Sequence, residues 1–233
     1  MKIALLGYGK MGKTIERLAS GKGHTVVFKS SSNSSEGDIE LADVAIEFST
    51  PETAVANLKK CFELNIPVVS GTTGWLEHYD EIIKLCEQRN GSFLYASNFS
   101  VGVNLFFNLN RYLAKLMQPW DEYKVSIEEI HHTEKKDAPS GTAITIAEGI
   151  IENSAKKTWN LDAKSEEEIN IVAKRIADVK GTHIVSYDSE IDKIEIKHEA
   201  HSRDGFAIGA IIAAQWLQNK KGVHTMKDVL GIK

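Results

Sequence analysis

The sequence lacks several features that would assign it to a specialised class of protein. Its 233 residues include only two cysteines, Cys61 and Cys86, which have neither metal-ligand spacing nor the spacing of a redox pair. We interpret both as reduced structural residues, and we predict no metal site. No apolar run is long enough to span a bilayer, and a strand is predicted from the first residues, with no signal segment before it. We therefore expect a cytoplasmic protein.

An excess of positive charge is also missing. The formal net charge is −4, and no block of lysine and arginine is dense enough to suggest binding to nucleic acid or to a membrane surface. The chain is 42% hydrophobic and 26% charged, which is typical of a globular protein. Its length suffices for two modest domains, each with a core of its own.

The first hundred residues alternate between predicted strands and helices. Apolar runs predict strands, whereas helical spacing of apolar residues marks the segments 51–64 and 75–89. Buried strands that alternate with helices favour an α/β fold, a Rossmann-like doubly wound parallel sheet. The strands are predicted at 2–7, 24–28, 43–48, 66–70 and 92–97.

A glycine-rich turn follows the first predicted strand and precedes a predicted helix. It contains Gly7, Tyr8, Gly9, Lys10, Met11 and Gly12. In this context a GxGxxG motif predicts dinucleotide binding, because its glycines permit a tight turn, approach to a pyrophosphate and close helix packing. An ordinary turn between strand and helix is the alternative.

The end of the second predicted strand bears on the choice of cofactor. An acidic residue at this point would bind the ribose diol of NAD, but the sequence has Lys29 followed by serines. A lysine with neighbouring hydroxyls can hold a 2′-phosphate, and no carboxylate in this segment would repel it. We therefore predict that NADPH is preferred and that NADH is also used. The alternative is a flexible serine-rich loop over residues 30–35.

Small and hydroxylated residues follow three other predicted strands. Because ligands bind outside the carboxyl ends of a parallel sheet, these ends predict a crevice for the nicotinamide and its ribose. The residues are Ser49, Thr50, Gly71, Thr72, Thr73, Ala96, Ser97, Asn98 and Phe99.

The pattern changes near residue 100, which predicts a second α+β domain with a mixed or antiparallel sheet. We expect helices at 105–117 and 143–155, a strand at 123–132, and neighbouring antiparallel strands at 182–189 and 192–202. Residues 154–170 are polar and are predicted to form a loop. Residues 207–218 predict a small-residue helix that packs back on the first domain. The expected domains are 1–99 with 207–233, and 100–206.

The segment "HHTEKKDAPSGTA", residues 131–143, combines proton donors with a helix start. If 123–132 is a strand, His131 and His132 point to opposite sides and have different roles. Lys135 follows, and a helix that starts at Ser140, Gly141 and Thr142 offers N–H groups to a carboxylate. A polar surface loop is the alternative. With a dinucleotide fold elsewhere in the chain, the segment predicts reduction of a small acidic substrate.

At this point the sequence resembles a known family. The pattern Glu-x-x-His-His-x-x-Lys-x-Asp-x-Pro-Ser-Gly-Thr-Ala in "EEIHHTEKKDAPSGTA" is similar to the signature of the 4-hydroxy-tetrahydrodipicolinate reductases, enzymes of diaminopimelate and lysine biosynthesis. The glycine-rich turn, "FSTPE", "SGTTG", "ASNFSVGVN" and "HSRDGFAIGAIIAAQWL" also appear in the family's order. Two regions resemble the family poorly, the one after the second strand and residues 154–170.

The resemblance implies a reaction and a role for each matching position. Enzymes of this family remove water from a dicarboxylate substrate and reduce its ring with hydride from NADPH or NADH. His131 would be the proton donor or acceptor and Lys135 a second donor, while His132, Ser140, Gly141 and Thr142 would hold the substrate. A homotetramer is also implied. Many members carry an acidic residue after the second strand, so Lys29 is a departure that puts NADH preference in doubt.

Two other functions are compatible with parts of the sequence. One is a different two-domain dehydrogenase, such as an aspartate or homoserine dehydrogenase, which would explain the first domain alone. The other is a non-catalytic NADPH sensor, which would need neither His131 nor Lys135.

Overall fold

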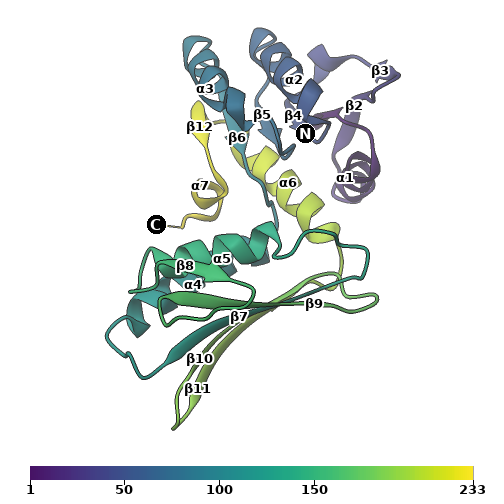
Figure 1. Ribbon diagram of the computed structural model, residues 1–233. Coiled ribbons are helices and arrows are strands. Elements are labelled where there is room, and N and C mark those ends of the chain that lie inside the picture. Colours follow the sequence, from purple (N-terminus) through teal and green to yellow (C-terminus); the bar gives the residue numbers. More distant parts are fainter. Residues whose placement is uncertain (233) are drawn as a thin grey trace. The chain divides into compact units, whose positions relative to one another are not determined.

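A computed structural model describes residues 1–232, which form two compact units: residues 1–101 together with the chain from 204 onward, and residues 102–203. The first unit is built on a seven-stranded sheet in the order β12-β6-β5-β4-β1-β2-β3 (Figure 1). Its neighbouring strands are parallel except for β3, which runs antiparallel to β2. The strands are β1 (Lys2–Leu6), β2 (Thr25–Ser30), β3 (Ser35–Gly37), β4 (Val44–Glu47), β5 (Val68–Ser70), β6 (Ser92–Tyr95) and β12 (Gly222–His224).

Helices cover both faces of this sheet, because its central strands are apolar on both sides. On β1, Ile3 and Leu5 face a core shared with α1 and α6, whereas Ala4 and Leu6 face a core shared with α2 and α3. The doubly wound parallel sheet predicted from the sequence is therefore confirmed. The helices are α1 (Lys10–Ser20), η1 (Ile39–Leu41), α2 (Pro51–Glu63), η2 (Leu76–His78), α3 (Tyr79–Gln88), α6 (Asp204–Leu217) and α7 (Met226–Leu230).

The two cysteines lie on the buried faces of α2 and α3. Both are free and buried, Cys61 in α2 and Cys86 in α3. Burial raises the pKa of the Cys61 thiol to about 12. A thiol that stays protonated is a poor nucleophile, which supports a structural role for these residues.

Helix α6 packs closely against the sheet because its buried face consists of small residues. Ala207, Ala210, Ala213 and Ala214 are fully buried. A Cβ atom at Gly209 would clash with the backbone carbonyl of Phe99, so only glycine allows the two backbones to approach this closely. Residues at the end of the chain therefore complete the core of the first unit.

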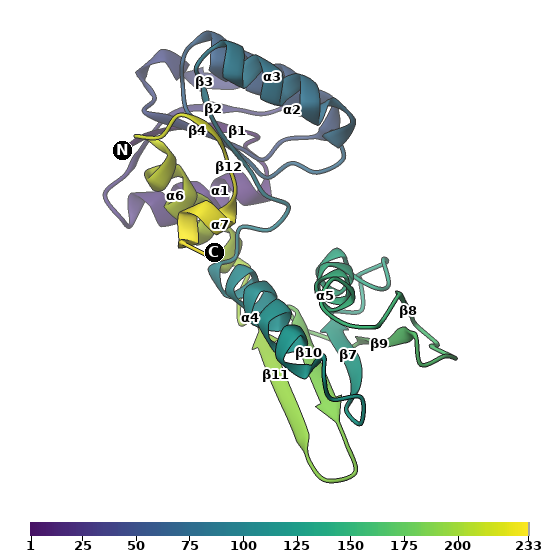
Figure 2. The ribbon, with the colours of Figure 1, turned by 90° about the vertical axis from the view of Figure 1, so that its left-hand side faces the viewer.

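The second unit has one mixed sheet with two helices on one face, as Figure 2 shows. The strand order is β11-β10-β7-β9-β8, in which β10 is antiparallel to both neighbours and the β7–β9 and β9–β8 pairs are parallel. Apolar residues of both helices pack on Ile127, Ile171 and Val185. The elements are α4 (Val101–Met117), β7 (Lys124–His131), α5 (Gly141–Ile151), β8 (Thr158–Asn160), β9 (Glu168–Arg175), β10 (Thr182–Asp188) and β11 (Lys193–Glu199).

The prediction of a loop over residues 154–170 is wrong. This region contains β8 and the first residues of β9. Ile169 and Ile171 alternate with exposed or half-buried residues, and both are fully buried beneath the helices. The many acidic residues just before them hid this alternation. The serine-rich segment is also more ordered than a flexible loop, because Ser35 pairs with Ser30 where β3 joins β2.

Among the helices of residues 1–232, none combines the length and the apolar character that crossing a bilayer requires.

Candidate functional site

The glycine-rich turn forms the start of α1 in the first unit. Gly7 has a φ of +103°, and a Cβ there would clash with the carbonyl of Phe48. A Cβ at Gly12 would clash with the carbonyl of Gly7, whereas one at Gly9 would meet nothing within 4 Å. The backbone is thus open only above Gly9, the N-cap of α1, where the first N–H groups of the helix can bind an anion. This arrangement fits the pyrophosphate of a dinucleotide.

A cavity of about 310 Å³ lies beside this turn, at the carboxyl ends of β4 and β5. It is lined by Met11, Phe48, Ser49, Pro51, Gly71, Thr72 and Thr73. Four of these residues belong to the segments in which the sequence predicts a nicotinamide crevice. A Cβ at Gly71 would lie 2.2 Å from the ring of Phe48, so any side chain here would require that ring to move.

Some of the residues predicted to bind the cofactor have side chains that are buried or already engaged within the protein. The Thr72 hydroxyl is buried and donates to Glu47 Oε1 at 2.9 Å, and the Phe99 ring packs on Phe48 with 5.6 Å between centroids. Thr73 and Ser97 are exposed at the ends of the adjacent strands β5 and β6. Of the remaining predicted residues, Tyr8, Met11, Ala96 and Asn98 are half-buried and Lys10 is exposed.

A buried carboxylate organises the floor of this crevice. Glu47 is fully buried and accepts from the Ser70 hydroxyl at 2.7 Å, the Thr72 hydroxyl, the Ser49 amide at 3.0 Å and the Ser49 hydroxyl. These bonds fix the polar groups that follow β4 and β5. Glu47 was not predicted as a site residue, because in sequence it reads as one polar residue within a strand.

The expectation that no carboxylate lies near Lys29 is wrong. The Lys29 ammonium is 3.0 Å from Glu16 Oε1 and 3.9 Å from Glu36 Oε2, and it lies over the ring of Tyr8. Glu16 comes from α1 and Glu36 from β3, where it pairs directly with Lys29. A hydrogen bond to Glu16 raises the pKa of Lys29. The sequence could not reveal this cluster, because both acids come from other elements.

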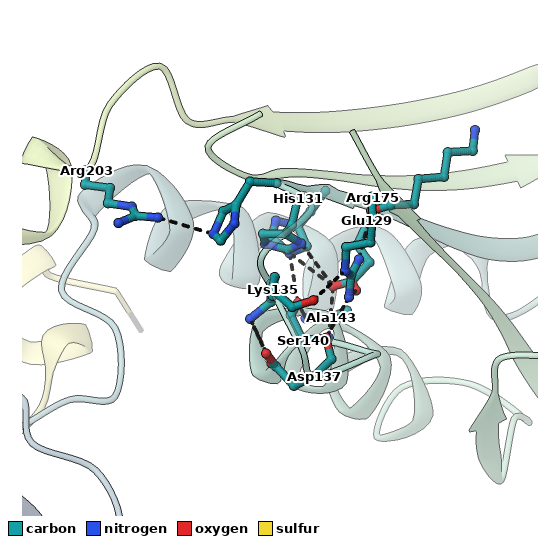
Figure 3. Close-up of polar contacts among 11 residues, drawn as sticks. Glu129, His131, Lys135, Asp137, Ser140, Ala143, Arg175 and Arg203 are labelled. Carbon is teal, nitrogen blue, oxygen red and sulfur yellow. Dashed lines mark hydrogen bonds and ion pairs between the residues drawn. The ribbon is translucent and has the colours of Figure 1, made fainter. Parts of the chain in front are cut away.

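In the second unit, the buried face of β7 changes character along the strand. Val125 and Ile127 belong to the apolar core, but the next two residues on the same face are Glu129 and His131. The register places Arg175 of β9 opposite His131 and His183 of β10 opposite Glu129. Four ionisable side chains therefore meet at one end of the sheet. Figure 3 shows three of them, Glu129, His131 and Arg175.

Glu129 lies at the centre of this cluster, which also touches the start of α5. Its Oε2 atom accepts the Ser140 amide at 2.9 Å and lies 3.6 Å from His131 Nδ1. The Ser140 hydroxyl caps α5 by accepting the Ala143 amide at 3.2 Å, and it also contacts His183 Nε2 at 3.3 Å. Ser140 is 3% exposed, so its hydroxyl is engaged within the chain and not directed to solvent.

Burial controls the protonation of the two histidines in the cluster. It lowers the pKa of His131, although the negative charge of Glu129 opposes the shift. Burial lowers the pKa of His183 to about 3, so this ring is neutral at physiological pH. His183 is thus a poor proton donor, which leaves His131 as the candidate of the pair for proton exchange.

Lys135 and its loop are held by two partners. The Lys135 ammonium pairs with Asp137 at 2.7 Å, and this bond lowers the pKa of the Asp137 carboxyl. The Arg175 guanidinium donates to the carbonyls of Lys135 at 3.3 Å and of Asp137 at 2.6 Å. The loop between β7 and α5 therefore has a defined shape.

His132 points away from this cluster and meets a residue that was not predicted. Arg203 Nη2 lies 3.2 Å from His132 Nε2. Because a guanidinium only donates, His132 Nε2 accepts and its ring carries the proton on Nδ1. Gly141, at the start of α5, has open space where a side chain would be, and Thr142 beside it is half-buried.

Glu129, His131 and His183 also approach the spacing of a metal site. One ligand atom from each lies within 4.8 Å of the others. However, Arg175 Nη2 lies 3.1 Å from Glu129 Oε1, and the Ser140 amide occupies the other oxygen. Since a cation here would face an arginine that already compensates the carboxylate, we interpret the cluster as a hydrogen-bonded network.

Comparisons with known proteins agree over the whole chain. The family described as dihydrodipicolinate reductase, N-terminus, matches residues 1–99, and its C-terminus counterpart matches residues 102–230. A 4-hydroxy-tetrahydrodipicolinate reductase of Christiangramia forsetii is 54% identical over 99% of this chain and 98% of the relative. A reductase of the same name from Methanococcoides burtonii is 40% identical over 81% of this chain and 73% of the relative.

The fold is shared with a solved structure. Dipicolinate-bound dihydrodipicolinate reductase from Paenisporosarcina sp. TG-14 matches with a TM-score of 0.80 and 22% identity, over 97% of both chains. At that identity the likeness concerns the fold alone. Because both halves match one family, neither the aspartate or homoserine dehydrogenase alternative nor a non-catalytic sensor is favoured.

Proposed function

Because this chain belongs to the dihydrodipicolinate reductase family, we propose how its residues share the steps of the family's reaction. The chain is an oxidoreductase that reduces 4-hydroxy-tetrahydrodipicolinate to tetrahydrodipicolinate with loss of water. The first unit binds the nicotinamide cofactor, and the second binds the substrate and supplies protons. The observation that carries the proposal is the cluster at the end of β7, where proton donors meet an open helix start.

The cofactor fits the first unit in two places. The helix start at Gly9 would hold the pyrophosphate, and the cavity lined by Met11, Gly71 and Thr73 would hold the nicotinamide end. When bound, the cofactor supplies the hydride that reduces the ring. Glu47 keeps the polar groups of the crevice in place and makes no proposed contact with the cofactor.

The substrate carries two carboxylates, and the second unit offers two groups of donors. The free N–H groups at Gly141 and Thr142 bind one carboxylate, because a helix start favours negative charge. Arg203 binds the other, since a guanidinium is suited to a carboxylate, and His132 contributes by accepting a hydrogen bond that holds the guanidinium in place. Ser140 acts by shaping the helix start, because its hydroxyl already caps α5.

Protons come from His131 and Lys135. Loss of water requires a proton on the departing hydroxyl, and hydride addition leaves a carbanion-like centre that also accepts one. His131 supplies one proton, because the pKa of His183 is too low for that ring to serve, and Lys135 carries an ammonium that Asp137 holds in place until the substrate's charge competes for it. These two roles remain predictions from the family resemblance that the geometry supports.

We propose that both cofactors are used and that NADPH retains a modest advantage. Lys29 is the cation available to a 2′-phosphate, but Glu16 and Glu36 already hold it. The phosphate must therefore displace a carboxylate, which reduces the advantage that a solvent-facing lysine would give. The cytoplasmic location and the homotetramer stay predictions.

A steady-state assay tests the proposed function. Substrate generated enzymatically is mixed with this protein and either NADPH or NADH. Aspartate and homoserine, which the alternative dehydrogenases oxidise, are tested in parallel with NADP⁺ or NAD⁺ as the hydride acceptor. We expect cofactor oxidation with the cyclic dicarboxylate only. Oxidation or reduction of cofactor with aspartate or homoserine, and none with the cyclic dicarboxylate, would assign the protein to another dehydrogenase class.

A further inference from the structure

The strongest unassigned feature is the ion pair between Glu129 and Arg175. Glu129 is fully buried, and Arg175 Nη2 lies 3.1 Å from its Oε1 atom. Removing the Glu129 carboxylate from water is expensive, the Arg175 side chain is only 21% exposed, and a pair of this kind is often no more stable than an apolar pair of the same size. Stability alone therefore gives a weak reason for placing this pair at the end of an otherwise apolar strand face.

Each partner holds a different part of the proposed site. Through Oε2, Glu129 accepts the Ser140 amide at the start of α5 and lies 3.6 Å from His131 Nδ1. Arg175 donates to the carbonyls of Lys135 and Asp137 in the loop that precedes α5. The pair thus connects the proposed proton donors to the helix start that would hold a substrate carboxylate.

We propose that Glu129 and Arg175 are positioning residues for the reaction: the carboxylate orients His131 and the start of α5, and the guanidinium holds the Lys135 loop against them. This inference rests on the proposed function, because it assigns the pair to the same site. Neither side chain is proposed to touch the substrate or the cofactor. They act through His131, Lys135 and Ser140.

The pair also sets the charge around His131. Five groups face this ring: Glu129 on its own strand, Lys135 and Asp137 from the following loop, Arg175 from β9, and His183 from β10. Burial lowers the pKa of His131, and the Glu129 carboxylate is the largest influence in the opposite direction. Removing that negative charge would lower the pKa further, so protonated His131 would be lost at a lower pH.

The experiment compares two adjacent glutamates of β7. Glu129→Gln removes the central charge but keeps the size of the side chain. Glu128→Gln is the matched control, because Glu128 points to the opposite face of the sheet and pairs there with Lys174. For each protein, kcat, KM, the pH profile of kcat, the dissociation constant for NADPH and the melting temperature are measured.

For Glu129→Gln we expect kcat to fall by about ten- to a hundred-fold, part of the roughly 10²- to 10⁴-fold that a general acid contributes. The loss of kcat at high pH should begin about one pH unit lower than in the wild type. NADPH binding should be unchanged, because it belongs to the other unit, and Glu128→Gln should behave as the wild type. A purely structural role would lower the melting temperature without moving the pH profile.

A second variant keeps the test decisive if Glu129→Gln does not fold. Arg175→Lys retains the positive charge beside Glu129 but loses the fork that reaches both loop carbonyls. We expect a kcat loss of about ten-fold with NADPH binding intact. A folded Glu129→Gln or Arg175→Lys protein with wild-type kcat and pH profile would overturn the proposal.

Two further outcomes are distinguishable. If the wild type does not turn over the substrate, the proposed function fails, and the positioning role fails with it. The other outcome is an active wild type whose activity rises with added Zn²⁺ and is abolished by a chelator. In that case Glu129, His131 and His183 hold a metal. That result would overturn the positioning role while leaving the reductase function in place.

Discussion

Lys29 and Glu16 form an ion pair at 3.0 Å, and the same carboxylate accepts a hydrogen bond from the Tyr8 hydroxyl. Tyr8 lies in the glycine-rich turn, so this pair links the phosphate-binding turn to the end of β2. The bond from Tyr8 lowers the pKa of Glu16, which keeps the carboxylate ionised. If Lys29 binds the 2′-phosphate of NADPH, as we propose, that phosphate must compete with this carboxylate.

Cofactor preference should therefore respond to Glu16 as well as to Lys29. We expect Glu16→Gln to increase the ratio of kcat/KM for NADPH to that for NADH by about five-fold, the upper range for a partly exposed ion pair. Lys29→Glu should reverse the preference, because it repels the phosphate and accepts from the ribose hydroxyls. Glu87→Gln, at an exposed position of α3, is the control. If neither Lys29→Glu nor Glu16→Gln alters the ratio of the two kcat/KM values, this cluster does not contact the phosphate.

Replacement of the proposed proton donors should affect turnover and not cofactor binding. We expect His131→Ala and Lys135→Ala each to lower kcat by about 10²- to 10⁴-fold. Thr142→Val should chiefly raise KM for the substrate, because it removes a hydroxyl that we expect to bind a carboxylate beside the N–H groups of the helix start. Lys136→Ala, an exposed neighbour, serves as the control. Near-normal kcat in both alanine variants would refute the assignment of His131 and Lys135.

The buried histidine of β10 should make the second unit sensitive to acid. The pKa of His183 is about 3 in the folded protein, below the ordinary value of 6.5, so the unfolded chain takes up a proton first as the pH falls. The stability that neutral His183 contributes is present above about pH 6.5 and is lost as the pH falls toward 3. The resulting decrease in the free energy of unfolding is roughly 3–5 kcal/mol.

Urea unfolding at a series of pH values measures this effect. His183→Gln cannot titrate, so its free energy of unfolding should change less with pH between 6.5 and 3 than that of the wild type. His78→Gln, at an exposed position of the other unit, is the control. Equal pH dependence in the wild type and in His183→Gln would contradict the shift.

Close packing of α6 should depend on one of its two glycines. Gly209→Ala places a Cβ against the backbone carbonyl of Phe99, and overpacking of this kind typically destabilises by about 1–3 kcal/mol. Gly205→Ala, in the same helix, is the control, because its nearest contact would be an ordinary 3.7 Å from the Ser100 hydroxyl. Thermal unfolding should separate the two variants. Equal melting temperatures would show that α6 can shift to accommodate the methyl group.

Local patterns allowed much of the fold to be predicted from the sequence. The apolar runs ending at Leu6 and Ser70 predicted buried strands, and the spacing of residues 51–64 predicted a helix. Segments without such a pattern were missed. β3 and β12 have three residues each and no fully buried side chain, so their pairing depends on neighbours that are distant in sequence. Ile169 of β9 was hidden beside a run of glutamates.

The candidate site was predicted only where its residues are close in sequence. The segment from His131 to Thr142 carried enough chemistry to be noticed without a structure. Arg175 and His183 were missed because they meet Glu129 through the register of β7 with β9 and β10. Similarly, Glu16 could not be linked to Lys29, because packing of α1 beside β2 brings them together.

Hydride transfer to the cyclic dicarboxylate is the central claim, and mass spectrometry of the product tests it most directly. The wild-type protein is given enzymatically generated 4-hydroxy-tetrahydrodipicolinate and NADPH in which both hydrogens at C4 of the nicotinamide are replaced by deuterium. We predict tetrahydrodipicolinate that contains one deuterium, formed in proportion to the NADPH oxidised. Oxidation of NADPH without deuterium in this product, or recovery of both compounds unchanged, would contradict the account.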